Sequence, residues 1–345
     1  MGELPDVGRV ALVPPTLEEV AARAGVSRST ASRAINGGDR VSPSALAAVR
    51  TAVADLGYSP NRAARSLVTR RTDSIALVVP EPDELALSDP FVLAILQGLS
   101  SSLADSDVQV VLVIARPGQS ERTVRFLQGG HVDGAVVVSH HFGGDLDPAL
   151  AHLPLPLVFV GRPLVGEEVG PEQYVDTDNE GGSAQATRHL IARGRRRIAT
   201  IAGPIDMSAG VERLAGWRRA LAEAGRPADA VVHADFTSAG GQAAAHRLLD
   251  EHPDVDGIVA ASDLIAVGAM AALAARGKRV PADVAVVGYD DLGVAAAALP
   301  PLTTVVQPAV AMAQAAVERP LGLLAGGPPR APEVFPATLV VRASS

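Results

Sequence analysis

The chain has 345 residues, of which 48% are hydrophobic and 20% are charged, and this suits two or three globular domains because one domain usually takes about 100–200 residues. It contains no cysteine, which excludes disulfides, thiolate metal sites and a cysteine nucleophile. The net charge of −8 is unevenly distributed: residues 1–72 hold ten arginines and six acidic residues, a net charge of +4, and the rest of the chain has a net charge of −12. This asymmetry indicates a basic N-terminal part that binds a polyanion and an acidic body with another task.

An irregular N-terminal stretch is followed by a predicted helix. Residues 1–15 have no apolar periodicity, and we expect a disordered lead-in there. Thr16 and Glu19 have the spacing of a capping box, which begins a helix. Gly25 ends that helix and permits the positive φ of a tight turn.

Two further helices are predicted after this turn. Ser27 can cap a helix over residues 28–35, and Ser42, followed by proline at the first helical position, begins another over residues 43–56. Two short helices joined by a tight turn form a helix-turn-helix. We therefore predict an all-α helix-turn-helix DNA-binding domain over residues 16–60.

The second helix carries the candidate DNA-reading side chains. Arg28, Ser29 and Arg33 are exposed in the predicted helix and can reach base edges in the major groove, where arginine pairs with guanine through two hydrogen bonds. Other polar residues are better placed for phosphates, which position the protein without specifying sequence. These are Ser27, Thr30, Asn36, Arg40 and Ser42, with Thr16 at the start of the first helix. The pattern alone leaves open a surface helical pair with scattered arginines.

After residue 72, apolar runs alternate with amphipathic helical patterns. This alternation indicates parallel sheets covered by helices on both faces, and the number of runs favours two doubly wound α/β lobes over one sheet. Ligands of such sheets bind beyond the carboxyl ends of the strands, here between the lobes. The runs are at 75–79, 108–114, 135–138, 157–160, 198–202, 257–261 and 284–287, and the helical patterns at 91–104, 120–129, 180–193, 209–224, 240–251, 263–276 and 308–325.

Two stretches carry a resemblance to a known family. Residues 16–27 read Thr-Leu-Glu-Glu-Val-Ala-Ala-Arg-Ala-Gly-Val-Ser, and residues 58–67 read Tyr-Ser-Pro-Asn-Arg-Ala-Ala-Arg-Ser-Leu. Together they resemble the head and hinge of the lactose/galactose repressor family. The resemblance implies that residues 61–72 are a hinge helix and linker that becomes ordered on operator DNA and pairs with that of a dimer mate in the minor groove.

The hinge also has implied contacts. Leu67, helped by Ala64, would wedge into a base step, with Asn61 and Arg62 near the DNA backbone. An inserted apolar side chain kinks the duplex, and so short a helix is unstable in water without its DNA partner. A plain linker that ends in an amphipathic turn is the alternative.

The resemblance covers the chain from Pro15 onward and implies a periplasmic-binding-protein-like body. Residues 73–345 would form an effector-binding and dimerisation domain, with lobe one at about 73–176 and 308–336 and lobe two at about 177–307 and 337–345. The matching landmarks are Asp178-Asn179, Gly182, Ala202-Gly203-Pro204, Arg213, Gly216-Trp217, Ser262-Asp263, Val287-Gly288-Tyr289-Asp290-Asp291, Pro301-Leu302-Thr303-Thr304-Val305 and Gln307.

The family's pocket positions fall on residue types that suit a sugar, since carboxylates and arginines bind hydroxyls and aromatic rings cover the apolar face of the sugar ring. Arg213 and Asp290 match the main pair. The other implied pocket residues are Asp89, Phe91, Arg162, Phe236 and Asp263, with His141 as a minor candidate. The lactose repressor has an aspartate in place of Gly161 and an asparagine in place of Ser262, so its galactoside preference is not carried over.

Each site has a plainer alternative. Arg213 and Asp290 could form a structural salt bridge between lobes, and Trp217 is expected in the core. His140 and His141 could suggest a metal site, but neighbouring residues on a strand point to opposite faces, so no metal is predicted. No Walker, dinucleotide, serine-hydrolase or zinc-protease motif is present, so we expect neither an enzyme nor a cofactor.

The sequence thus predicts a cytoplasmic, sequence-specific transcriptional regulator. We expect a homodimeric repressor of a carbohydrate operon on a palindromic operator, controlled by a small ligand, a sugar or sugar phosphate, between the lobes. No leucine-heptad tail precedes Ser345, which favours a dimer over a tetramer, and neither a secretory signal nor a membrane span is evident. A soluble sugar-binding protein or a sugar-converting enzyme without a DNA role is the alternative. The sequence leaves open whether the ligand induces or co-represses, and whether some promoters are activated.

Overall fold

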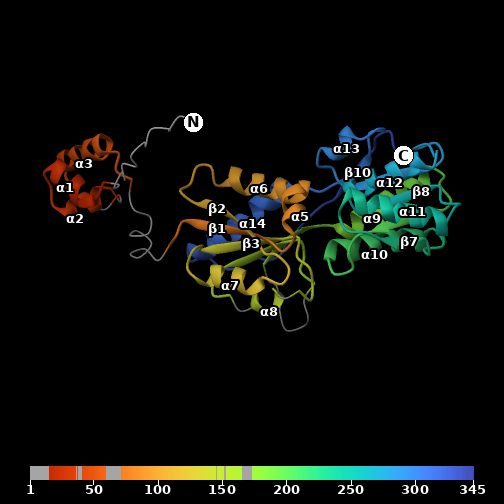
Figure 1. Ribbon diagram of the computed structural model, residues 1–345, viewed down its shortest axis with the longest axis horizontal. Coiled ribbons are helices and arrows are strands. Elements are labelled where there is room, and N and C mark those ends of the chain that lie inside the picture. The colour runs from red at the N-terminus through yellow and green to blue at the C-terminus, as the bar shows by residue number, and fades with distance from the viewer. Residues whose placement is uncertain are drawn as a thin grey trace, which may run out of the picture. The chain divides into compact units, whose positions relative to one another are not determined.

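A computed structural model describes residues 15–35, 37, 41–59, 71–144, 146–150, 153–164 and 173–345. The chain divides into two compact units, one up to Thr72 and one from Asp73 onward (Figure 1). The predictions for residues 1–14 and for the hinge helix lie outside the described residues. The domain limits set from the sequence remain predictions.

The first unit contains the predicted helix-turn-helix. Its helices are α1 (Leu17–Ala24), α2 (Arg28–Ile35) and α3 (Pro43–Leu56). The capping box at α1 is present, because the Thr16 amide donates to Glu19 Oε2 at 2.7 Å and the Glu19 amide donates to Thr16 Oγ1 at 3.3 Å. Gly25 has φ 65° and ends α1 in the left-handed conformation, as predicted. The small core consists of Val20, Ala21, Ala31, Val49 and Ala52.

The second unit contains two six-stranded sheets. The first sheet has the order β11-β5-β4-β3-β1-β2, and all its strands are parallel. Its strands are β1 (Ser74–Val79), β2 (Gln109–Ile114), β3 (Gly134–Val138), β4 (Leu157–Val160), β5 (Tyr174–Thr177) and β11 (Glu333–Phe335). Alternate residues of β1 and β3 enter opposite cores, one shared with α5 (Asp83–Ser88), α6 (Pro90–Ser102) and α14 (Ala309–Leu324), and the other with α7 (Ser120–Gln128) and α8 (Asp147–Leu150). Both faces of this sheet are therefore covered, as the continuous apolar runs predicted.

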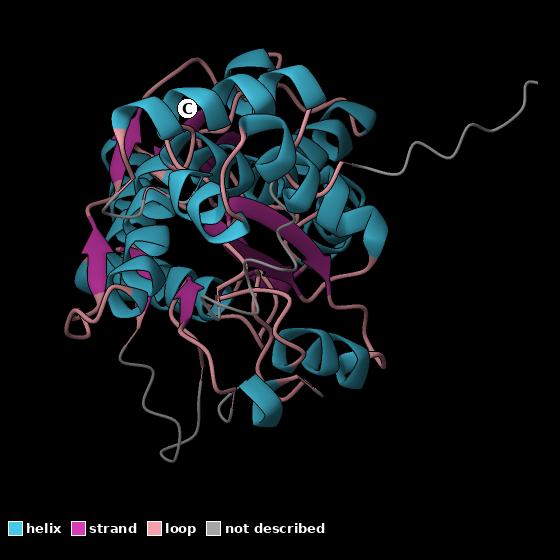
Figure 2. Cartoon of the chain, turned by 90° about the vertical axis from the view of Figure 1, so that its left-hand side faces the viewer, coloured by secondary structure: helices cyan, strands magenta, loops and turns pink. Residues whose placement is uncertain are grey.

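The second sheet has the order β12-β10-β9-β8-β6-β7. Only β12 runs antiparallel, against β10. The strands are β6 (Ile198–Ala202), β7 (Val231–His233), β8 (Gly257–Ala260), β9 (Ala285–Asp290), β10 (Thr303–Val306) and β12 (Thr338–Val340). One face packs on α9 (Asn179–Ala192) and α10 (Ser208–Glu223), the other on α11 (Ser238–Glu251) and α12 (Asp263–Ala275), while α13 (Val294–Ala297) follows β9. Figure 2 shows the magenta strands among the cyan helices.

The chain passes between the two sheets at three points within residues 173–345: after β5, after β10 and after β11. These crossings divide the second unit into two lobes, which we call lobe one (the sheet with β1) and lobe two (the sheet with β6). The two-lobed α/β architecture predicted from the sequence is confirmed. No helix in the part of the chain that the structure describes is long and apolar enough to span a bilayer.

Candidate functional site

The outer face of α2 presents the predicted DNA-reading residues. Arg28, Ser29 and Arg33 are all exposed. Arg28 Nε lies 2.6 Å from Glu18 Oε1 of α1, and Arg33 Nε donates to the carbonyl of Ser29 at 3.2 Å. Arg28 and Arg33 are thus both exposed to solvent on a short helix, as expected of side chains that contact bases in a groove.

The residues predicted to contact phosphates have different local roles. Ser27 begins α2, because the Thr30 amide donates to Ser27 Oγ at 3.2 Å and the two hydroxyls lie 2.8 Å apart. Thr16 and Ser42 cap α1 and α3 with their side-chain oxygens, so each can offer DNA only the polar groups that capping leaves exposed. The candidates outside the described residues are Asn36, Arg40, Asn61, Arg62, Ala64 and Leu67.

A pocket lies between the lobes, beyond the carboxyl ends of the strands of both sheets. Its empty space is about 810 Å³, counting the part that opens to solvent. Lobe one contributes residues at the start of α6 and after β4, and lobe two contributes residues from α10, α12 and the end of β9. Of the predicted effector residues, the pocket brings together Asp89, Phe91, Arg162, Arg213, Phe236, Asp263 and Asp290.

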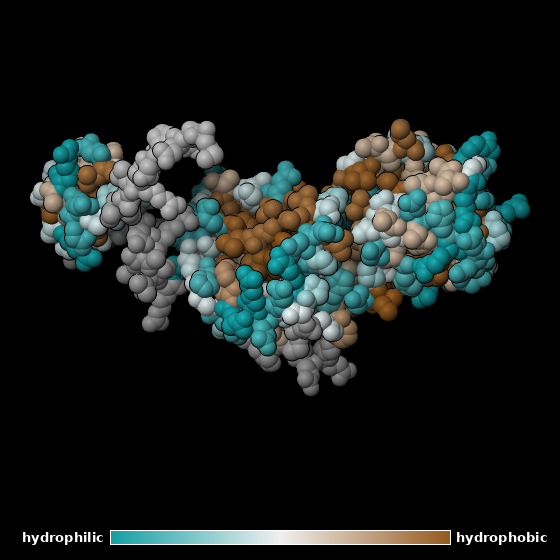
Figure 3. All heavy atoms as spheres, viewed as in Figure 1, coloured by the Kyte–Doolittle hydropathy of each residue, from teal (hydrophilic) through white to brown (hydrophobic). Residues whose placement is uncertain are grey.

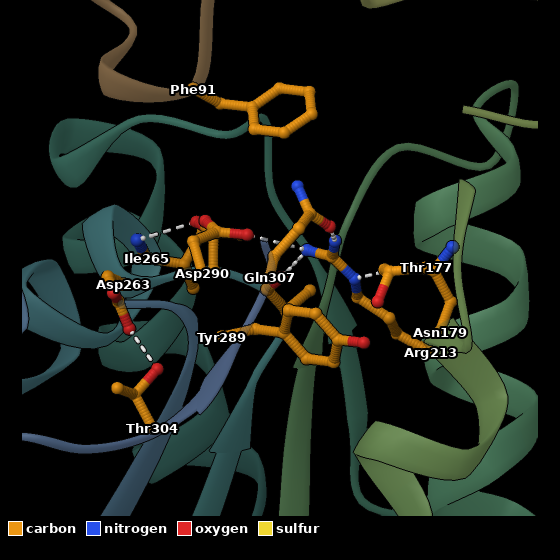
Figure 4. Close-up of polar contacts among 12 residues, drawn as sticks. Phe91, Thr177, Asn179, Arg213, Asp263, Ile265, Tyr289, Asp290, Thr304 and Gln307 are labelled. Atoms are coloured by element: carbon orange, nitrogen blue, oxygen red, sulfur yellow. Dashed lines mark hydrogen bonds and ion pairs between the residues drawn. The ribbon is translucent and has the colours of Figure 1, made fainter. Parts of the chain in front are cut away.

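Arg213 is the centre of this pocket, and Figure 4 shows its contacts. It is only 5% exposed. Its Nε donates to Asn179 Oδ1 at 2.9 Å, its Nη1 to the carbonyl of Ala261 at 2.6 Å and its Nη2 to Gln307 Oε1 at 2.8 Å. The guanidinium also lies 3.7 Å above the centre of the Tyr289 ring. A buried charge needs such partners to offset its lost hydration.

Asp290 completes the centre and ends β9. Its Oδ1 accepts from Arg213 Nη1 at 3.4 Å, a long contact for a charge-assisted hydrogen bond. Burial raises the pKa of Asp290 well above its ordinary value, Arg213 opposes this rise, and the neighbouring Asp263 and Asp89 add to it. Asp290 also has φ 116°, a conformation rare for a residue with a side chain. Strain of this kind is concentrated at ligand-binding sites.

Two more pocket carboxylates have shifted pKa values. Burial raises the pKa of Asp263 to about 6, opposed by hydrogen bonds from the Thr304 hydroxyl at 2.6 Å and the Asp291 amide at 2.8 Å. Burial also raises the pKa of Asp89 to about 6, opposed by the Phe91 amide, which donates at 2.8 Å. Each carboxylate is fixed by the backbone and can accept a hydrogen bond from a ligand hydroxyl.

Arg162 lies at the edge of the pocket rather than at its centre. Its side chain is exposed and lies 5.5 Å from the centre of the Tyr174 ring, and its Nη1 is 3.4 Å from Glu212 Oε1. Its amide donates to Asp176 Oδ2 at 2.8 Å. Arg162 therefore connects the loop after β4 with α10 of lobe two at the mouth of the pocket.

His141 does not line the pocket, although its neighbour His140 does. The assumption that both residues lie on a strand is wrong, because β3 ends at Val138. His141 Nε2 lies 2.9 Å from Glu81 Oε1, and its Nδ1 lies 2.9 Å from Asp206 Oδ2 of lobe two. These carboxylates raise the pKa of His141 to about 9, against the effect of burial. Both ring N–H groups therefore donate at neutral pH, and His141 connects the lobes beside the pocket.

Sequence reasoning did not single out the residues that hold Arg213 in place. Asn179 and Gln307 line the pocket, and Tyr289 lies beneath the guanidinium. All three residues fall within the sequence landmarks, so their position next to predicted pocket residues was the one feature of the sequence that could have identified them. Their role depends on three separate chain segments meeting at Arg213, which spacing along the sequence does not reveal. Gly161 and Ser262, where the chain departs from the lactose repressor, both line the same pocket.

Comparison with known proteins gives one consistent result. The family of bacterial regulatory proteins of the lacI type matches residues 16–61, and the periplasmic binding protein-like domain matches residues 187–345. The HTH-type transcriptional regulator CelR of Thermobifida fusca is 53% identical over 298 residues, which cover 85% of this chain and 87% of that protein.

Two solved structures are similar over nearly the whole chain. The complex of the transcriptional regulator CelR with cellobiose has a TM-score of 0.76 and 46% identity, and the alignment covers 96% of this chain and 100% of that one. The Lac repressor dimer bound to operator and the anti-inducer ONPF has a TM-score of 0.85 and 30% identity, covering 96% and 99%. The resemblance found in the sequence motifs is thereby confirmed. The chain belongs to the lacI family of bacterial regulatory proteins and is a DNA-binding transcriptional regulator.

Proposed function

We propose that this regulator is a homodimeric repressor of carbohydrate-utilisation genes, and that an uncharged sugar held between its lobes controls its affinity for a palindromic operator. The observation that carries the proposal is the interlobe pocket, which combines buried carboxylates, Arg213 and the rings of Phe91 and Phe236. Carboxylates accept hydrogen bonds from sugar hydroxyls, and aromatic rings contact the C–H faces of pyranose rings. Because the similar CelR structure is a complex with cellobiose, cellobiose is the first effector to test.

The charges of the pocket favour an uncharged sugar over a sugar phosphate. Arg213 already donates four of its five N–H groups to protein acceptors, and Arg162 is paired with Glu212. A phosphate group needs positively charged donors that are free to bind it. Among the described residues that line the pocket, Arg162 and Arg213 are the only lysines or arginines. The pocket also contains Asp89 and Asp263, whose pKa values of about 6 leave both carboxyls mainly ionised at neutral pH, and these charges would repel an anion.

The surface of lobe one supports a dimer. Leu87 of α5, Leu93 of α6 and Val310 of α14 are 56%, 46% and 45% exposed, and α6 packs directly on α14. Figure 3 shows apolar side chains gathered over this part of lobe one. A contiguous apolar surface of this kind marks a protein–protein interface, and a two-fold dimer would match the symmetry of a palindromic operator.

The test begins with selection of bound sequences from random duplex DNA by the full chain, at a stated salt concentration. We expect a palindrome of about one to two helical turns. Titration of the selected duplex with cellobiose, glucose and cellobiose phosphate would then identify the effector, and the sign of the change in affinity would show whether it induces or co-represses. Sedimentation velocity would give the oligomeric state.

Two results would contradict the proposal. One is binding that depends on salt but not on sequence, both with and without the sugars. The other is a response to the phosphorylated sugar alone, which would overturn the argument from pocket charge.

A further inference from the structure

The acidic first turn of α1 contains two glutamates with different partners. Glu19 belongs to the capping box and accepts from the amide and hydroxyl of Thr16. Glu18 instead lies beside Arg28, with 2.6 Å between its Oε1 and Arg28 Nε. The side chains of Glu18 and Arg28 are 61% and 70% exposed, so this pair stands on the outer surface where α1 meets α2.

The geometry of the pair determines which edge of Arg28 remains available. The carboxylate of Glu18 approaches the guanidinium of Arg28 most closely at Nε rather than at either of its two terminal nitrogens. These two nitrogens are the end-on fork that donates two parallel bonds to guanine O6 and N7. A carboxylate at the same place also repels phosphate, so it lowers the gain from a contact of Arg28 with the DNA backbone.

We propose that Glu18 is a specificity-determining residue, which positions Arg28 for base edges and penalises its use as a phosphate contact. The proposal rests on the DNA-binding role of α2 in the proposed function. Glu18 acts through Arg28 and improves discrimination between operator and other DNA rather than affinity as such. Its cost is weaker binding to all DNA, because it adds a negative charge beside the reading surface.

The test compares the full chain with Glu18→Gln on operator and on random-sequence duplex over a range of salt concentrations. Glu18→Gln should bind random DNA about three- to tenfold more tightly, with a salt slope steeper by about one unit, as expected for one additional phosphate contact. Its affinity for the operator should rise less or fall, so the ratio of the two affinities declines.

Asp55→Asn is the matched control. Asp55 pairs with Arg23 at 2.9 Å on the same unit, and its side chain is 43% exposed. This variant removes the same charge without touching Arg28, so it should leave the affinity ratio unchanged. A thermal melt of both variants checks that the unit remains folded.

The outcomes separate the inference from the function on which it rests. If Glu18→Gln preserves the affinity ratio, or changes both affinities as Asp55→Asn does, Glu18 has no role in specificity and the proposal is wrong. If the parent chain itself does not distinguish operator from random DNA, the proposed function fails, and the inference fails with it.

Discussion

Arg213 holds the pocket together as well as facing it. Its guanidinium is buried against Tyr289 and donates to groups from α9, from the residue that follows β8 and from the segment after β10. An uncompensated buried charge is costly, so removing one member of a buried pair destabilises a protein by about 3–5 kcal/mol. The same side chain thus belongs both to the lining of the pocket and to the packing of lobe two.

We expect Arg213→Gln to abolish cellobiose binding and to lower the free energy of unfolding by about 3–5 kcal/mol, because Asp290 and Gln307 lose their buried partner. Calorimetric titration and urea unfolding would measure the two effects. Arg219→Gln is the control, since Arg219 lies on the same helix, pairs with Glu180 and is 44% exposed, and an exposed pair contributes about 0–1 kcal/mol. Equal losses in both variants would contradict the central role of Arg213.

The residue types of the pocket could be predicted, but their network could not. The family motifs pointed to Arg213, Asp290 and Asp263, and all three share the pocket. Asn179 and Gln307 could not be assigned, because neither residue type is diagnostic and their contacts bring together segments far apart in the chain. His141 was expected as a minor pocket residue, but it lies beside the pocket, and its carboxylate partners became visible only in three dimensions.

Asp89 should make the affinity of the pocket for a sugar depend on pH. Its pKa is raised to about 6, mainly by burial, and a sugar hydroxyl donates more strongly to the carboxylate than to the protonated acid. Cellobiose binding should therefore release protons, and its affinity should rise by about three- to tenfold between pH 5 and pH 7.5.

Asp89→Asn keeps an oxygen that can cap α6 but cannot ionise, so its affinity should vary less over this range. Calorimetric titration in buffers of different ionisation enthalpy would count the released protons. An unchanged pH profile in Asp89→Asn would assign the dependence to Asp263 or Asp290 instead.

At the scale of elements, the packing of α9 on α10 positions Arg213. A Cβ built on Gly216 of α10 would lie 2.1 Å from the carbonyl oxygen of Glu180 in α9. The close approach places Arg213 within reach of Asn179 at the start of α9. Gly216 of the sequence landmark is therefore explained by the close contact between α9 and α10, which leaves no room for a side chain, rather than by an unusual backbone conformation.

Gly216→Ala should separate these helices and cost about 1–3 kcal/mol of unfolding free energy, together with a loss of cellobiose affinity. Gly322 of α14 is the control, because a Cβ there meets nothing within 4 Å, and alanine in place of glycine within a helix stabilises by up to about 1 kcal/mol. Thermal unfolding of the two variants would measure the contrast. If Gly216→Ala is as stable as Gly322→Ala, the close approach has no energetic role.

The long elements could be predicted from the sequence, and the short ones could not. Strands such as β1 and β3 are continuous apolar runs, and α14 has a long amphipathic pattern. The three-residue strands β7, β11 and β12 are too short for a periodic signal. Their places in the sheets depend on pairing with distant strands, such as β12 against β10.

At the scale of the whole molecule, the contacts between the lobes determine how an effector can act. A ligand shifts an equilibrium between lobe arrangements only by the difference in its affinity for them. Beside the pocket, His141 of lobe one lies against Asp206 of lobe two, and the Phe142 amide donates to the carbonyl of Asp206 at 2.7 Å. This contact stabilises the arrangement of lobes seen here, and it should therefore contribute to effector affinity.

The charge of His141 determines the pH range over which this contact stabilises the fold. The pKa of the folded state is about 9, above the ordinary value of about 6.5. The folded chain then holds a proton that the unfolded chain loses between these values, so the stabilisation is complete below pH 6.5 and disappears as the pH rises through 9. We expect a loss of about 1–3 kcal/mol over this range in the parent.

His141→Gln should remove this part of the pH dependence of urea unfolding, and should increase hydrogen exchange at the Phe142 amide at pH 7. His189→Gln is the control, because burial lowers the pKa of His189 and its ring bonds to Ser345 rather than to a carboxylate. That variant should keep the parental loss of stability above pH 6.5. If His141→Gln shows the same loss as the parent, the interlobe contact does not carry the pH dependence. If the Phe142 amide exchanges as slowly as before, His141 does not hold the lobes together.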